Sequence, residues 1–279
     1  MKITEAFERG EFVVTAEVGP PKGCHIENML EEAKTYLSDI TAVNVTDNQS
    51  SVMRLGSLAV CKALKDEGLT PIFQMTCRDR NRIALESDLL SAAMFGIENL
   101  LLLTGDHTKL GDHPQAKPVF DLDSVSLIHT VKQLESGVDL GGNELVGEPP
   151  KFAKGAVVSP CSDSVDVQLA KMERKVAAGA EYFQTQAVYE PEKFIQFMEK
   201  AKQFGKPVQL GIVIPKSVGM CRYMNANVAG IHIPEEMIDE LKADKEKTKA
   251  GITGVEIAAR IIRECKPYCQ GVHIMAMGW

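Results

Sequence analysis

Apolar runs rich in β-forming residues recur along the chain, and amphipathic stretches separate them. Stretches such as IENMLEEAKTYL and DSVDVQLAKMERKVAAG place their apolar residues at the spacing of a helix that is buried along one face. Several of these stretches end at a glycine, which suits the left-handed position after a helix. The pattern predicts strands that alternate with helices, and hence a parallel sheet. The expected strands span residues 12–19, 41–47, 71–77, 99–106, 155–161, 182–189, 208–215 and 271–278.

Eight such units favour a closed (β/α)8 TIM barrel, and an open doubly wound sheet is the alternative. No Pro- or Ser-rich linker interrupts the repeats, and no G-x-G-x-x-G motif follows the first strand to mark a dinucleotide crevice. We therefore expect a single barrel domain over residues 1–279. Because Trp279 closely follows the last strand, we expect the barrel to lack its eighth outer helix. The outer face of the last and first strands would then offer apolar surface to a partner.

Polar side chains follow the apolar part of five expected strands, always at the carboxyl end and at alternate positions. A period of two directs these side chains to one face of each strand, and in a barrel that face is the interior at the upper rim. For any one strand the alternative is a set of buried residues bonded to backbone, but repetition on five strands favours an active-site mouth. The residues are Thr15 and Glu17; Asn44, Thr46 and Asn48; Gln74 and Thr76; Thr104 and Asp106; Gln184 and Gln186.

Composition narrows the class of ligand. Hydrophobic residues make up 44% and charged residues 25%, as in ordinary globular proteins. The formal charge of -7 provides no basic field for a phosphate backbone, so nucleic-acid binding is disfavoured. The charged N-terminus has no apolar signal segment, and no run approaches the ~18 residues that cross a bilayer. We expect a cytoplasmic protein that acts on a small molecule and has no membrane partner.

The seven cysteines are an odd number and are scattered along the chain, which indicates reduced thiols rather than a disulfide framework. Cys265 and Cys269 lie close in sequence, but Pro267 separates them and no second pair completes a four-ligand site. We therefore expect no metal.

Glu17 is the candidate general acid. It ends the first strand just before a turn that Gly19, Pro20 and Pro21 impose, so its position is well defined. A carboxyl group inside a barrel mouth loses hydration, which favours its protonated form and suits proton donation. An ion-paired structural glutamate is the alternative.

The fourth strand ends in Thr104-Gly105-Asp106 and leads into a loop of about eighteen residues. Loops of this length in a barrel are usually functional. Gly105 allows the backbone to approach a ligand, and Asp106 can accept hydrogen bonds from ring N–H groups. On the fifth helix, Arg174 and Lys175 either contact a phosphate of an anionic cofactor or simply complement the helix dipole.

Motifs spread over nearly the whole chain carry a family resemblance through their order. They are Glu17 before Pro20-Pro21, Val45-Thr46-Asp47-Asn48, Met75-Thr76-Cys77, Thr104-Gly105-Asp106, Gly111-Asp112, Phe120-Asp121-Leu122-Asp123-Ser124, Arg174-Lys175-Val176 with Ala178-Gly179-Ala180, and Thr185-Gln186. In this order they resemble the methylenetetrahydrofolate reductase family.

The resemblance implies that FAD binds at the carboxyl ends of the strands. It implies that reduced flavin passes a hydride to 5,10-methylenetetrahydrofolate, giving 5-methyltetrahydrofolate for one-carbon metabolism and methionine biosynthesis. Glu17 matches the family's general acid, whose proton opens the five-membered ring of the folate to an iminium. Asp106 matches an aspartate near flavin and pterin, and Gln186 a glutamine that bonds the pterin. Tyr223 matches an aromatic residue that stacks on folate or nicotinamide.

The family's flavin-contacting positions map onto several strand ends of this chain. Gln74 stands where the family commonly has histidine, and Ser159 replaces an aromatic residue, so the electron donor stays open. The matching residues are Thr46, Gln74, Thr104, Gly105, Asp106, Phe120, Ser159, Arg174 and Lys175.

The short form resembles catalytic subunits of acetogenic bacteria, which pair with an iron–sulfur and zinc protein. The resemblance therefore implies either NADH or such a subunit as electron source, and a hetero- or homo-oligomer. A different class of function remains the alternative: a barrel without redox chemistry that binds a pterin or folate and presents it to a partner. Bound flavin distinguishes the two.

Overall fold

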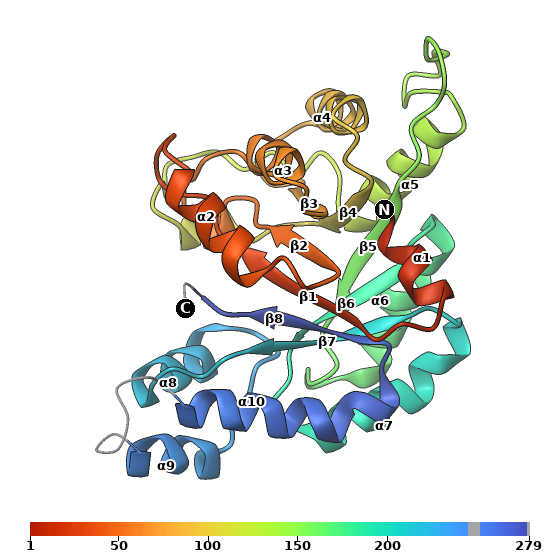
Figure 1. Cartoon of the computed structure of the whole chain (residues 1–279). Helices are drawn as coiled ribbons and strands as arrows, with labels where there is room; N and C mark the ends of the chain where they lie inside the picture. The colour runs from red at the N-terminus through yellow and green to blue at the C-terminus, as the bar shows by residue number, and fades with distance from the viewer. Residues whose placement is uncertain (245–251, 278–279) are drawn as a thin grey trace.

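Eight parallel strands form a closed barrel in chain order, with β1 pairing to β8. The computed structural model describes residues 1–244 and 252–277 (Figure 1). The TIM-barrel prediction is confirmed. Each expected strand is present and the ends differ by a few residues, while Gly278, in the last expected strand, lies outside the described residues. The strands are β1 (Val13–Val18), β2 (Ala42–Val45), β3 (Pro71–Thr76), β4 (Asn99–Leu103), β5 (Ala153–Val158), β6 (Tyr182–Ala187), β7 (Val208–Val213) and β8 (Gly271–Met275).

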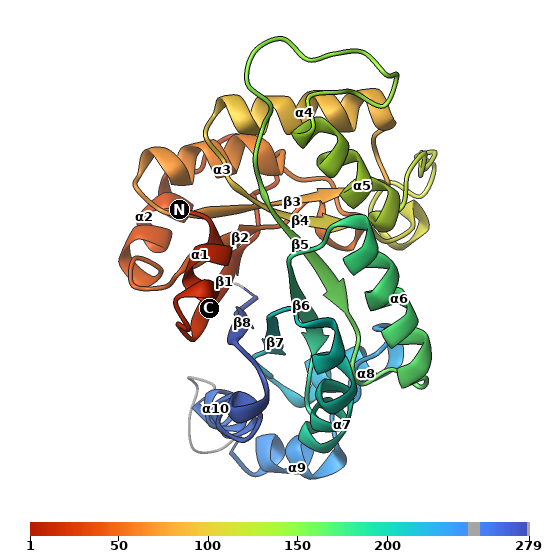
Figure 2. The same ribbon diagram turned by 90° about the vertical axis from the view of Figure 1, so that its right-hand side faces the viewer.

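Helices connect successive strands and surround the barrel (Figure 2). Three of them lie between β7 and β8, where a simple alternation of strands and helices predicts one. None of the helices described here combines the length and apolar character needed to cross a bilayer. The connecting helices are α2 (Glu27–Tyr36), α3 (Ser57–Asp66), α4 (Arg82–Met94), α5 (Ser124–Glu135), α6 (Val165–Ala178), α7 (Pro191–Ala201), α8 (Val218–Asn227), α9 (Glu235–Asp244) and α10 (Ile252–Cys265).

Short-range chemistry in the sequence defines the ends of several helices. The side chains of Asn81, Asp123 and Ser164 accept hydrogen bonds from backbone N–H groups in the first turns of α4, α5 and α6. These bonds satisfy donors that a helix start leaves without partners. Helix α6 ends at Ala178 and is capped by Gly179, whose φ of 119° is a left-handed conformation that glycine adopts at little cost.

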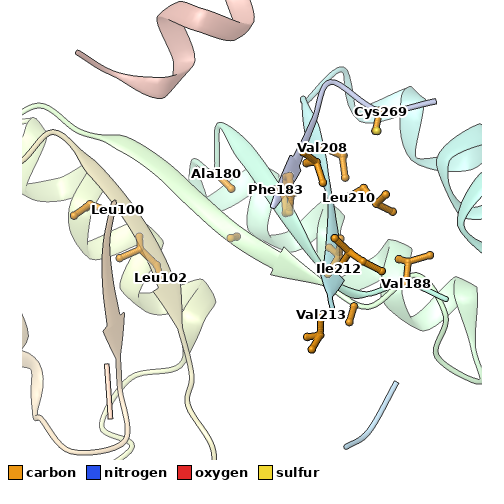
Figure 3. Close-up of a cluster of buried hydrophobic side chains, with 14 of the residues drawn as sticks. Leu100, Leu102, Ala180, Phe183, Val188, Val208, Leu210, Ile212, Val213 and Cys269 are labelled. Atoms are coloured by element: carbon orange, nitrogen blue, oxygen red, sulfur yellow. The ribbon is translucent and has the colours of Figure 1, made fainter. Parts of the chain in front are cut away.

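Alternate residues of the strands point outward and form the layer between barrel and helices. On β7, Val208, Leu210 and Ile212 point to this layer, and Phe183 of β6 packs beside them (Figure 3). The intervening positions of the strands point into the barrel. Successive side chains of a strand point to opposite faces. Both faces are therefore apolar where the strands begin, and only the inward face becomes polar toward their carboxyl ends.

The helix α1 (Ile3–Glu8) closes the end of the barrel where the strands begin (Figure 1). Ile3 and Ala6 are fully buried against side chains inside the barrel, such as Val13 and Ala42. The backbone N–H of Ile3 donates to Asn99 Oδ1 at 2.7 Å, and the N-terminal amine pairs with Glu98 at 2.6 Å. Thus α1 plugs the barrel base and does not cover the outer side of β8 and β1. No helix follows β8 up to Met277, and Trp279 lies outside the described residues.

We predict that Gly155→Ala destabilises the barrel through its interior. A Cβ at residue 155 would lie 2.3 Å from Cζ of Tyr182, a fully buried ring whose hydroxyl donates to the Leu100 carbonyl. Because the ring is held, the free energy of unfolding should fall by about 1–3 kcal/mol in urea denaturation.

Two further variants test this origin. Removal of the ring in Tyr182→Leu should make the added methyl group nearly neutral, giving a coupling of about 1 kcal/mol or more. Gly23→Ala is the control, because a Cβ there meets no atom within 4 Å. Additive effects of the two substitutions would contradict the steric explanation.

Candidate active site at the barrel mouth

A cavity of about 400 Å³ opens at the carboxyl ends of β2 to β6. A larger groove of about 770 Å³ lies at the opposite end, beside α1 and α7. We assign the site to the smaller cavity, because TIM barrels place their chemistry at the carboxyl ends of the strands. The structure brings most of the predicted site residues together there. Thr46, Gln74, Thr104, Gly105, Asp106, Ser159, Lys175 and Gln186 all line this cavity.

Four predicted residues are not part of this lining. Glu17 lies on β1, and the other three lie elsewhere. Arg174 lines a separate groove between α5 and α6, next to His129. Phe120 lies in the loop after β4 with a positive φ, its ring 6.3 Å from that of His107. Tyr223 lies on α8 with 64% of its surface exposed. The ligand contacts expected for these three residues stay predictions.

Glu17 lies at the carboxyl end of β1, and its side chain is only 8% exposed. Its Oε1 accepts a hydrogen bond of 3.3 Å from Gln49 Nε2, and Gln49 also lines the cavity. Its Oε2 lies 3.7 Å from His273 Nε2 on β8. In the described part of the chain, no lysine or arginine lies within ion-pair distance of Glu17. The arrangement therefore differs from a structural glutamate held by a permanent cation.

The segment that carries Gln49 is strained. Asn48, Ser50 and Ser51 all have positive φ values, of 46°, 55° and 61°. Such conformations cost energy for residues other than glycine and persist where the surroundings impose them. The loop after β4 packs directly on this segment, since a Cβ at Gly111 would lie 1.7 Å from the Ser51 carbonyl oxygen. The packing of these two loops therefore places Gln49 beside Glu17.

A buried carboxylate, Asp47, ties the ends of β2 and β3 together. Its side chain is 0% exposed and accepts hydrogen bonds of 2.9 Å from both the backbone N–H and the hydroxyl of Thr76. Arg80 donates two further hydrogen bonds, at 2.8 and 3.1 Å. The second arginine, Arg78, donates to the backbone carbonyls of Asn48 and Asp106. The two arginines thus fix the loops that form one wall of the cavity.

A register shift on β6 places Gln186 at the rim. The pairing of β6 with β7 is irregular between Gln184 and Ala187, so the intervening segment bulges. Gly211 on β7 makes this possible, because a Cβ there would lie 2.1 Å from the Thr185 carbonyl oxygen. Bulges commonly redirect side chains next to functional sites.

Two lysines of α6 form the cationic side of the cavity. Lys175 is half-buried, and its Nζ donates to the Val157 carbonyl at 2.6 Å. Burial, and to a smaller extent the neighbouring charge of Lys171, lower the pKa of Lys175 to about 8, although Asp123 acts in the opposite direction. An anion bound here would gain attraction from both ammonium groups.

Six of the seven cysteines are buried in the core, Cys24 is exposed, and none of them lines the cavity. Cys265 and Cys269 are buried, and burial raises the pKa of the Cys265 thiol to about 12. A thiol that stays protonated is a poor nucleophile and a poor metal ligand. Among residues 1–244 and 252–277, no group of three or more possible ligating side chains is assembled for a metal.

Sequence reasoning missed several residues of the site. His273 shares the inward parity of Gly271 and Met275 on the eighth strand, so the period of two could have indicated it. Lys171 lies one helical turn before Lys175, a spacing that places both on one face. Nothing in the local sequence indicates that Gln49 approaches Glu17, because loop packing decides it.

Fold and site together define an α/β barrel with a polar site for a small molecule at the carboxyl ends of its strands. The chain belongs to the methylenetetrahydrofolate reductase family, whose model matches residues 2–278.

Named relatives agree with this assignment at low identity. The chain is 24% identical over 265 residues to the 5,10-methylenetetrahydrofolate reductase of Escherichia coli, covering 91% of this chain and 82% of that protein. It is 25% identical over 223 residues to methylenetetrahydrofolate reductase 2 of Schizosaccharomyces pombe, covering 77% of this chain but only 34% of that protein. It therefore spans about a third of the fission-yeast relative.

A solved structure from Clostridium thermocellum has the same architecture, with a TM-score of 0.68. The identity is 15%, and the match covers 99% of this chain and 93% of that one. That protein binds two copies of 5-methyl-5,6,7,8-tetrahydrofolic acid. At this identity the likeness shows the fold alone.

We predict that Asp47→Ala unfolds the cavity wall. Removing the carboxylate leaves the Thr76 donors and the Arg80 guanidinium without their partner, so the free energy of unfolding should fall by about 3 kcal/mol. Urea denaturation measures this change.

Two variants calibrate the result. Asp47→Asn keeps one acceptor oxygen and should cost less than the alanine variant. Asp66→Ala removes an exposed pair with Lys62 and should cost less than about 0.5 kcal/mol. Equal costs for Asp47→Ala and Asp66→Ala would contradict the role assigned to Asp47.

Proposed function

We propose that this chain catalyses the FAD-dependent reduction of 5,10-methylenetetrahydrofolate to 5-methyltetrahydrofolate, with Glu17 as the general acid. One observation carries the proposal: in a chain of this family, a nearly buried carboxyl group lies at the carboxyl end of β1, and no lysine or arginine of the described residues lies within ion-pair distance of it. A general acid must be free to give its proton to the substrate, and this carboxyl group is not held in an ion pair with a lysine or arginine of the described residues.

The residues of the cavity fit a flavin dinucleotide. Lys171 and Lys175 offer positive charge to phosphate groups, while the hydroxyl and amide groups of Thr46 and Gln74 suit the polar edge of the ring system. Gly105, with φ of 93°, exposes backbone at the rim, where a side chain would also crowd Thr76. When bound, FAD would supply the hydride that reduces the one-carbon unit.

The protein's own groups would prepare the folate. Glu17 gives its proton to the folate, which opens the five-membered ring and yields an iminium that accepts a hydride. Gln186, aimed at the rim by the bulge, bonds the pterin, and Asp106 accepts hydrogen bonds from ring N–H groups. Folate stacking on Tyr223 stays a prediction, and so does the identity of the electron donor, NADH or a partner subunit.

The test of the acid is Glu17→Gln. This variant keeps the shape of the side chain but cannot donate the proton, so folate reduction should fall by about 10²-fold or more. FAD binding and folate binding should stay close to those of the wild type. Turnover by reduced enzyme, followed with folate added after anaerobic reduction of the flavin, measures the effect.

Glu32→Gln, at an exposed position on α2, is the matched control and should leave the rate of folate reduction unchanged. Near-normal turnover of Glu17→Gln would remove Glu17 from the mechanism.

The cationic side gives a pH-dependent prediction. Lys175 is charged below about pH 8 and loses its proton as the pH rises through this value, so the affinity for FAD should weaken above it. Lys175→Met should bind FAD more weakly and with little pH dependence in this range. Lys175→Arg should keep its charge throughout. Titration of flavin fluorescence from pH ~7 to ~9 measures all three, and a flat wild-type profile would contradict the assignment.

A binding protein without redox chemistry is the second candidate. The Clostridium thermocellum neighbour, which binds 5-methyltetrahydrofolic acid, favours folate binding by this architecture. Flavin discriminates between the two functions. A purified protein with an absorbance band near ~450 nm supports the reductase, and folate binding without flavin uptake supports the carrier.

A further inference from the structure

A network of buried polar side chains fills the barrel directly below Glu17. The hydroxyl, amide and imidazole groups come from β1, β2, β6, β7 and β8 and bond to one another. No side-chain nitrogen or oxygen buried in the described residues lacks a partner. Such a network constrains the proton positions of its members, because each donor needs an acceptor. The members are Thr15, Asn44, Gln184, Gln209 and His273.

The backbone carbonyl of Val272 can only accept hydrogen bonds, so it determines which groups around it donate. Gln209 therefore turns its Nε2 to this oxygen, at 3.2 Å, and the same nitrogen donates to Thr15 Oγ1 at 3.1 Å. Its Oε1 then accepts from Gln184 Nε2 at 3.1 Å, and this nitrogen also lies 3.4 Å from Thr15 Oγ1. The two protons of Gln184 Nε2 have nearer acceptors, in Gln209 Oε1 at 3.1 Å and Asn44 Oδ1 at 3.2 Å. The Gln209 amide is therefore the donor to the oxygen of Thr15.

The hydroxyl proton of Thr15 itself has one close acceptor. That acceptor is Nδ1 of His273, at 3.0 Å, whereas the Val272 carbonyl lies 3.5 Å away. A neutral imidazole carries a proton on one nitrogen only. Since Nδ1 accepts from Thr15, the ring proton lies on Nε2, the nitrogen that faces Glu17 Oε2.

The contact from Nε2 to Glu17 measures 3.7 Å, somewhat longer than a hydrogen bond, and a movement of less than about 1 Å closes it. Catalytic hydrogen bonds often tighten only when ligands bind. Gln49 already donates to the other oxygen. The carboxylate that remains after proton transfer would therefore meet an uncharged donor at each oxygen.

We propose that His273 is the positioning residue of the acid: Thr15 fixes its tautomer, and its Nε2–H stabilises the Glu17 carboxylate formed on proton donation. The acid role of Glu17 rests on the proposed function, while the tautomer follows from the hydrogen bonds alone. A histidine held only for packing would need neither the Thr15 donor nor a nitrogen aimed at Glu17.

Nitrogen NMR of protein labelled with ¹⁵N at histidine tests the tautomer without cofactor or substrate. The chain has 6 histidines, and the resonances that His273→Asn removes identify the ring. Near neutral pH the wild type should show a bare Nδ1 and a protonated Nε2. Thr15→Val, of the same shape, should release the constraint and give a mixture of tautomers. A protonated Nδ1 in the wild type would overturn the proposal.

Two substitutions then separate positioning from packing. The amide of glutamine reaches the place of Nε2, so His273→Gln should keep the donor to Glu17 and lie within a few-fold of wild-type kcat. The amide of asparagine reaches only the place of Nδ1, so His273→Asn should lower kcat about 10-fold, the loss of one hydrogen bond to a charged group. KM for folate and FAD affinity should change little in both. Equal losses, or losses confined to KM, would overturn the positioning role.

The outcomes also separate this proposal from the proposed function. A wrong tautomer removes the role of His273 and leaves Glu17 free to act as the acid. Normal turnover of Glu17→Gln removes the acid mechanism, and with it the catalytic role of His273. The NMR result would then still stand as a property of the hydrogen-bonded network.

Discussion

Closure of the sheet by pairing of β1 with β8 is the constraint on which the rest of the structure depends. The register places Thr15 opposite His273, so groups far apart in sequence share one interior layer. The approach is close: a Cβ at Gly271 would lie 2.3 Å from the Val13 carbonyl oxygen. Because the barrel is closed, each buried inward polar side chain must find its partner among the other inward side chains or the carbonyl groups of the strands. The polar side chains around Thr15 and His273 are therefore bonded largely to one another.

The mouth is rigid for a different reason. The ends of β2, β3 and β4 carry polar loops, and buried charges rather than apolar packing hold these loops together. Asp47 accepts hydrogen bonds from Thr76 and Arg80. Arg78 connects the loops after β2 and β4 by donating hydrogen bonds to a backbone carbonyl in each. Such fully bonded charges are costly to disrupt, which makes the wall a stable support for ligand contacts.

Charge is unevenly distributed across the mouth. The ammonium groups of Lys171 and Lys175 lie on α6, whereas Glu17 lies on β1 beside uncharged donors. One side thus suits an anionic group, and the other suits proton transfer to a neutral ring nitrogen. This separation agrees with the proposed reaction, in which a cofactor with phosphates and a folate with a basic nitrogen share one cavity.

The sequence by itself determined the strands, their inward faces and several helix starts. These properties depend on neighbours in the chain: the period of two directs side chains such as Gln74 inward, and Ser164 caps the helix that follows it. Only the tertiary structure decided which inward groups meet. Lys175 faces the cavity while the adjacent Arg174 faces another groove, because successive helical residues point in different directions and packing selects one. The contact of His273 with Glu17 needs barrel closure, a long-range event that no local pattern encodes.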